Sequence, residues 1–139
     1  MVAICVRTLG AAPVTCNARP LLFKAYASLE RGEFIAAGCQ LREAIRLWLH
    51  AECQYFYCLP PSSKRPELPP IVLAKALKKS GEMGPDHFEW VKEAIEIANK
   101  SAHLVFVRPS LVTCCIEMMH AFIDGSDYLI EPVAAGRLS

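Results

Sequence analysis

A long run of apolar residues, spaced three and four positions apart, occupies the first half of the chain. It extends from Glu33 to about Tyr57, and polar residues such as Gln40, Glu43 and Arg46 fill the positions between. The apolar positions are Phe34, Ala37, Leu41, Ile45, Trp48, Leu49 and Phe56, with Glu52 in the same series. Since this spacing places side chains on one face of an α-helix, the run predicts one long helix that buries that face.

Four shorter helices are expected around the long one, each bounded by glycine or proline. The expected ranges are Leu21–Glu30, Ile71–Lys79, Asp86–His103 and Ser110–Gly125. Pro20 and Pro109 precede two of these helices, and Gly32, Gly81 and Gly125 mark helix ends. The pattern predicts an all-α fold, an up-and-down bundle of about five helices with a long central helix, in a single domain over residues 1–139.

Three segments are expected to lie outside the helices. Residues 1–20 form an N-terminal arm, in which Val2–Leu9 is either a short strand that pairs with another subunit or a loosely packed tail. Residues 59–70 read LPPSSKRPELPP, and the five prolines of this stretch predict a surface loop. Residues 131–139 are expected to form a C-terminal tail.

Composition narrows the classes of function. Fifteen basic and fourteen acidic residues give a net charge of +1, so no general field attracts nucleic acid or an anionic membrane. No apolar stretch is long enough to span a bilayer. The seven cysteines form no CxxC pair, which favours reduced thiols in the cytoplasm. A hydrophobic content of 53% is high for a soluble chain of this size, and we expect a homodimer or other homo-oligomer.

The predicted helix from Asp86 to His103 carries the most informative polar residues. Glu96, Asn99 and His103 are three and four residues apart, so they share a face of that helix. A carboxylate, an amide and an imidazole in one row can hold a ligand or assist proton transfer near neutral pH. The alternative is that His103 only ends the helix, where a positive charge is favoured by the helix dipole.

Two parts of the sequence resemble the HEPN-like superfamily of small helical proteins. The long helix begins with Gly32-Glu33-Phe34 and then Ala36-Ala37, as many long helices of that superfamily do. The later segment IANKSAH places Asn99 four residues before His103, which is similar to the superfamily's polar residue and histidine. The resemblance covers about residues 21–122 and implies a homodimer packed through helices, with a polar groove around Asn99 and His103.

The resemblance also bears on catalysis. Nuclease members of the superfamily have an arginine immediately before the polar residue, and it acts with the histidine on RNA at the dimer interface. This sequence has Ala98 at that position, and alanine cannot stabilise the charge that develops on a phosphate. Arg42 or Arg46 of the long helix would have to serve as a substitute. The resemblance therefore implies a chain without nuclease activity.

We therefore expect a non-catalytic, HEPN-like dimeric binding domain, without a cofactor, as a component of a toxin–antitoxin or similar defence pair. Its ligand would be a nucleotide, a nucleic acid or a partner protein, held by Glu96, Arg42 and Arg46 beside Asn99 and His103. Two alternatives remain open: a metal-independent endoribonuclease that uses His103, and a purely structural or regulatory protein-interaction module.

No metal site is expected from the sequence. Glu117 and His120 form a single ExxH unit, whereas helix-borne di-iron sites need two such units and further glutamates. His50 and Cys53 are one turn apart but lack further ligands. The adjacent Cys114 and Cys115 are expected to point one outward and one into the core.

Overall fold

The computed structural model describes residues 15–60 and 68–125 of the chain, and all regular structure in these two ranges is helical. The helices are α2 (Thr15–Glu30), α3 (Phe34–Tyr55), α4 (Pro70–Lys79), α5 (Pro85–Ala102) and α6 (Pro109–Gly125). The expected all-α fold is confirmed. The segment Val2–Leu9 and the tail 131–139 lie outside the described ranges. None of the described helices is long and apolar enough to cross a membrane.

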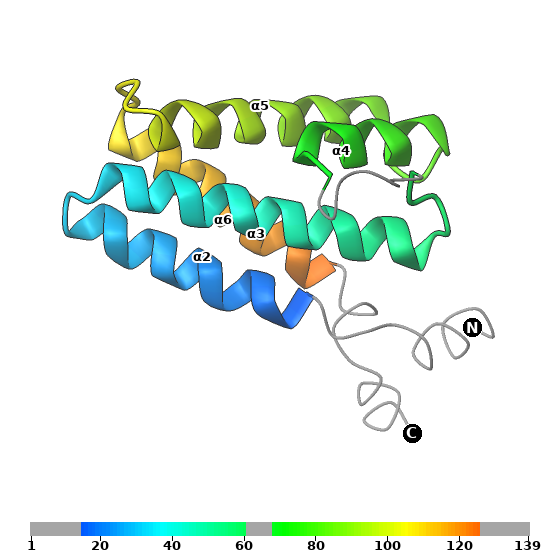
Figure 1. The fold of residues 1–139 in the computed structure, drawn as a ribbon, viewed down its shortest axis with the longest axis horizontal. Helices are drawn as coiled ribbons and strands as arrows, with labels where there is room; N and C mark the ends of the chain where they lie inside the picture. The colour runs from blue at the N-terminus through cyan, green and yellow to red at the C-terminus, as the bar shows by residue number, and fades with distance from the viewer. Residues whose placement is uncertain (1–14, 61–67, 126–139) are drawn as a thin grey trace.

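The long helix α3 is the centre of the bundle. It packs against the other four helices, with α2 on one side and α5 on the other (Figure 1). Phe34 at the start of α3 contacts Ser101 at the end of α5, so these two helices run in opposite directions. The helix α4 instead runs parallel to α3, because Arg42 and Arg46 lie near its first residue whereas Cys53 contacts Leu73. The chain therefore doubles back between α3 and α4, and this step departs from strict up-and-down alternation.

The start of α2 differs from the sequence-based expectation. The helix begins at Thr15 and continues through Pro20, so the predicted boundary between arm and helix after Pro20 is wrong. Proline removes one backbone hydrogen bond to the residue four positions earlier, but it leaves the following amides able to bond. Pro20 lies in the second turn of α2, where the loss of a single hydrogen bond does not end the helix.

One hydrophobic core fills the space between the helices. The largest fully buried side chains are Leu22, Leu41, Ile45, Leu49, Leu73, Leu77, Val91, Val112, Ile116, Met119 and Ile123. The stripe predicted for α3 faces this core, with Phe56 half-buried against it, except at Phe34, which is exposed. The amphipathic pattern is thus confirmed, and Phe34 is left at one end of the bundle.

The helices α3 and α5 approach each other closely at Gly38. A Cβ atom added to Gly38 would lie 2.5 Å from the backbone nitrogen of Ala102 and 2.8 Å from the Cβ of Ser101. Such distances are shorter than van der Waals contact, so only glycine allows this approach. The hydroxyl of Ser101 also donates a hydrogen bond of 2.7 Å to the carbonyl of Phe34. The start of α3 is therefore attached to the end of α5.

Four of the helices end in the same hydrogen-bonded turn, the Schellman motif. Its amide-to-carbonyl bonds are Glu33 to Ser28 (2.9 Å), Cys58 to Cys53 (3.0 Å), Glu82 to Leu77 (3.0 Å) and Val105 to Lys100 (2.9 Å). The residue before each donor has a positive φ: 76° at Gly32, 54° at Tyr57, 85° at Gly81 and 66° at Leu104. Glycine adopts this conformation freely, whereas other L-residues lose roughly 1–2 kcal/mol in it. Two of the four turns are therefore strained.

Candidate functional site

The predicted polar row lies on the surface of α5. Asn99 is half-buried, and both Glu96 and His103 are exposed, as expected for one face at the edge of the buried side. His103 caps the helix, and its amide donates hydrogen bonds to the carbonyls of Asn99 (3.1 Å) and Lys100 (3.2 Å). The three side chains thus share a face, which is one part of the predicted site.

Ala98, which the resemblance to HEPN-like nucleases places at their arginine position, lies in the core. Ala98 has no exposed surface and is part of the core cluster with Val91 and Ile95. A guanidinium at this position would have to be placed among hydrocarbon side chains, which is costly for a charged group without a partner. The helix α5 therefore has no room for such an arginine beside Asn99.

The two candidate arginines come from α3. Arg46 donates a 2.8 Å hydrogen bond from Nε to Glu43, and Arg42 is exposed. Because Gly38 lies against Ala102 and the helices are antiparallel, Arg42 lies at the same height along the bundle as the turn of α5 that contains Asn99. Both arginines line a small hollow of about 170 Å³ where α4 begins. Their joint action with His103 stays a prediction.

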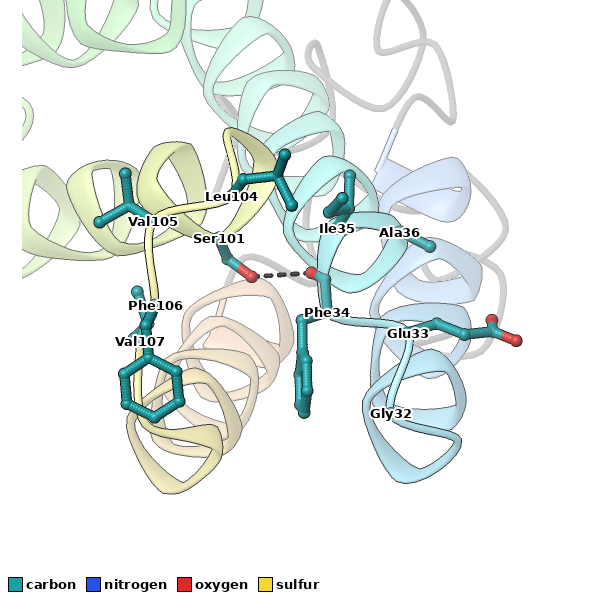
Figure 2. Close-up of a pocket in the computed structure, with 10 residues that line it drawn as sticks. All are labelled: Gly32, Glu33, Phe34, Ile35, Ala36, Ser101, Leu104, Val105, Phe106 and Val107. Carbon is teal, nitrogen blue, oxygen red and sulfur yellow. Dashed lines mark hydrogen bonds between the residues drawn. The ribbon is translucent and has the colours of Figure 1, made fainter.

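A larger hollow lies at the end of the bundle, between the start of α3 and the segment after α5. It has a volume of about 400 Å³, and Figure 2 shows its two walls. One wall is Gly32–Ala36, and the other is Ser101 together with Leu104–Val107. The hydrogen bond from Ser101 to Phe34 joins the walls, and the rings of Phe34 and Phe106 project toward the same side. Asn99 and His103 are next to this hollow in sequence but do not line it.

The side chains around this hollow are unusually exposed for their type. Leu104 is 80% exposed, Phe106 79% and Val105 51%. Eleven large hydrophobic side chains are exposed in the described part of the chain, and six of them are at this end: Phe34, Ile35, Leu104, Val105, Phe106 and Leu111. We call these six residues the apolar end. Scattered exposed apolar residues are normal, but a cluster of this kind marks an interaction surface.

A second hollow adjoins the first. It has a volume of about 430 Å³ and is lined mainly by the helix α5 near Ile97 and Lys100 and by Val107, Arg108 and Leu111. Phe106 and Val107 line both hollows. The exposed ring of Phe106 therefore stands between two recesses that are each large enough for an aromatic side chain.

Leu104 combines exposure with backbone strain. It occupies the positive-φ position of the α5 turn, where α2 and α4 have Gly32 and Gly81. A glycine would form the same turn at lower conformational cost, and a polar side chain would not expose hydrocarbon. Tyr57 has the same strain at the end of α3, so it is the cluster of exposed apolar side chains around Leu104 that distinguishes the apolar end.

The remaining histidine and cysteine candidates from the sequence lie in packing contacts, in the core or at the surface. His120 packs its ring 4.9 Å from that of Phe23. Cys114 is exposed and Cys115 is buried, as predicted, and burial together with the nearby Glu93 charge raises the pKa of Cys115 to about 11. Within residues 15–60 and 68–125, no group of three or more His, Cys, Asp or Glu side chains could hold a metal ion.

Leu104, Val105 and Phe106 are candidate site residues that the spacing of residues along a single helix does not reveal. A signal for them is nevertheless present in the sequence. The apolar run LVFV directly follows the end of the predicted helix at His103 and precedes Pro109, where a connection between helices is usually polar.

Comparison of the chain with models of protein families, with curated proteins and with solved structures gave no match.

Proposed function

We propose that this chain is a non-catalytic protein-binding domain that works as a homodimer, with two copies meeting through the apolar end. The proposal depends on one observation above all: Leu104, Val105 and Phe106 are exposed around two adjoining hollows. The described residues that line the first hollow include no cationic side chain, which favours a protein over a nucleotide or nucleic acid, whose binding depends on such side chains.

A second copy of the chain is the partner that fits this surface best. A two-fold symmetric interface places the same patch of both subunits together, so the patch must be complementary to itself. The apolar end has a projecting ring, Phe106, and a recess on each side of it. The Phe106 ring of each copy can therefore enter a recess of the other copy.

The expected affinity is modest. Burying a large apolar side chain stabilises by about 1.5–3 kcal/mol, so covering the exposed parts of Leu104, Val105 and Phe106 contributes roughly 3–6 kcal/mol per copy. Two copies contribute roughly 6–12 kcal/mol, and association itself costs an amount of the same order. The surplus is on the order of 8 kcal/mol at most, so the dissociation constant is roughly 1 μM at the tightest.

The polar row would then lie at the rim of the dimer. His103 immediately precedes Leu104, so an interface through Leu104 brings one His103 from each copy to its edge. This arrangement agrees with what the HEPN-like resemblance implies for Asn99 and His103. A place in a toxin–antitoxin or defence pair belongs to the same proposal and rests on that resemblance alone.

The test measures self-association with a pair of matched variants. Leu104→Asp introduces a charge at the strained turn of the apolar end, and Tyr57→Asp introduces the same charge at the equivalent turn of α3, at the opposite end of the bundle. Tyr57 is 87% exposed, which is similar to Leu104. Sedimentation equilibrium should show a dimer for the natural chain and for Tyr57→Asp, and a monomer for Leu104→Asp.

Two results would contradict the proposal. The first is a natural chain that stays monomeric at concentrations on the order of 100 μM, roughly a hundredfold above the tightest dissociation constant that this interface allows. The second is a Leu104→Asp variant with native circular dichroism that dimerises as strongly as the natural chain.

A further inference from the structure

The strained turn at the end of α3 brings two cysteines together. In a Schellman motif the side chains of the third residue from the helix end and of the second residue beyond the cap are frequently in contact. In α3 these two residues are Cys53 and Cys58, and the amide of Cys58 donates a 3.0 Å hydrogen bond to the carbonyl of Cys53. Tyr57, between them, adopts the positive φ that the turn requires.

The Cys58 thiol acts on the Cys53 thiol from within the same turn. Burial raises the pKa of Cys53, and the charge of Cys58 and hydrogen bonding to it raise this pKa further. The Cys53 thiol also lies 3.5 Å from the carbonyl oxygen of Leu73 in α4. The backbone bond across the turn and the influence of Cys58 on the pKa of Cys53 thus agree that the two side chains lie close together.

The two cysteines differ in how easily a reagent can reach them. Cys53 is buried and Cys58 is half-buried. A thiol that is accessible to a reagent reacts first, and a buried partner can then complete the exchange from within. This order is the one found in pairs of an attacking and a resolving cysteine.

We propose that Cys53 and Cys58 are a modification site. The two cysteines form an intramolecular disulfide with each other by thiol–disulfide exchange with a small-molecule disulfide such as glutathione disulfide. The Cys58 thiolate attacks one sulfur of glutathione disulfide, breaks its S–S bond and releases one glutathione thiolate. The Cys53 thiol then gives its proton to solvent, and its sulfur attacks the Cys58 sulfur and releases the second glutathione thiolate. The two cysteine thiols are oxidised, and one glutathione disulfide is reduced to two glutathione molecules.

The experiment equilibrates the full chain with reduced and oxidised glutathione, alkylates the remaining free thiols and digests the protein with trypsin. The tryptic peptide over residues 47–64 contains Cys53 and Cys58 and no other cysteine. In the bridged state it escapes alkylation and is lighter than the reduced peptide by two hydrogen atoms. We expect the equilibrium constant for the bridge to be at least about tenfold larger in native buffer than in concentrated urea, because the turn holds the thiols together.

Three variants make the test specific to the turn. Tyr57→Gly keeps the positive φ, so its equilibrium constant for the bridge should still be larger in native buffer than in urea. Tyr57→Pro retains both cysteines, but proline cannot adopt this φ. Its equilibrium constants in the two solvents should therefore be equal, while its circular dichroism stays native. Cys58→Ser should give no bridge in either solvent.

Equal constants in native buffer and in urea would overturn the inference. It would also be overturned if glutathione remained attached to Cys58 while Cys53 was alkylated, since the second exchange would then not occur.

Discussion

Replacing Leu104 by glycine and by alanine separates backbone strain from side-chain contacts at the apolar end. Both changes remove the side chain, which is 80% exposed and so gives up few contacts in the monomer. Only glycine relieves the positive φ, a gain of about 1–2 kcal/mol. Glycine loses about 0.5–1 kcal/mol of this gain because it is more flexible in the unfolded chain. Leu104→Gly should therefore be more stable than Leu104→Ala by about 0.5–1 kcal/mol.

The same comparison runs in reverse at Gly32. This residue has a φ of 76°, and a Cβ added to it would meet no atom within 4 Å. Any loss of folding stability in Gly32→Ala is therefore due to the backbone. It should equal the difference between Leu104→Gly and Leu104→Ala, about 0.5–1 kcal/mol. A shared value at the two positions would show that the strain at Leu104 is that of an ordinary left-handed residue.

The assay is urea denaturation followed by circular dichroism, at protein concentrations low enough that dimerisation does not contribute to stability. The Leu104→Gly variant should unfold at higher urea than Leu104→Ala, and it should self-associate more weakly than the natural chain. A Leu104→Gly variant that is no more stable than Leu104→Ala would refute the strain argument, because the glycine would then relieve nothing.

Three further outcomes are expected. Gly38→Ala should destabilise the fold by about 1–3 kcal/mol in urea unfolding, because its Cβ would clash with Ala102, whereas Gly125→Ala, which meets open space, should cost little. Burial and the Arg46 charge lower the pKa of His50 in the folded chain. The free energy of unfolding should therefore be highest above the pKa of His50 in the unfolded chain, near 6.5, and should fall as the pH drops below it. His50→Gln should remove this dependence on pH. Purified protein at micromolar concentration in chelator should leave mixed RNA intact, and cleavage lost in His103→Ala would instead support the ribonuclease alternative.

The fold was largely predictable because it is encoded by local spacing. The three- and four-residue repeat of α3 and of α5 places the same side chains in the core that the pattern indicates, such as Leu41, Ile45 and Val91. The start of α2 was not predictable in this way. Pro20 is a common helix boundary, and its place in the second turn depends on residues that precede it in the same helix.

The candidate site was only partly predictable, for a different physical reason. Asn99 and His103 share a face because they lie on one helix, and their spacing alone determines this. The apolar end is built from two segments that are far apart in the sequence, joined by the hydrogen bond between Ser101 and Phe34. Spacing along one helix carries no information about which segments meet. The parallel direction of α4 and α3 could not be predicted from the sequence for the same reason.

The attachment of Phe34 to Ser101, together with the close approach at Gly38, has a kinetic consequence. The two walls of the hollow cannot move apart without breaking a short hydrogen bond and opening a tightly packed helix contact. The backbone positions of Phe34 and Ser101 are therefore set before an incoming molecule makes contact. Its association rate should be governed by diffusion and orientation, and the lifetime of the complex should vary far more than this rate when residues of the surface are changed.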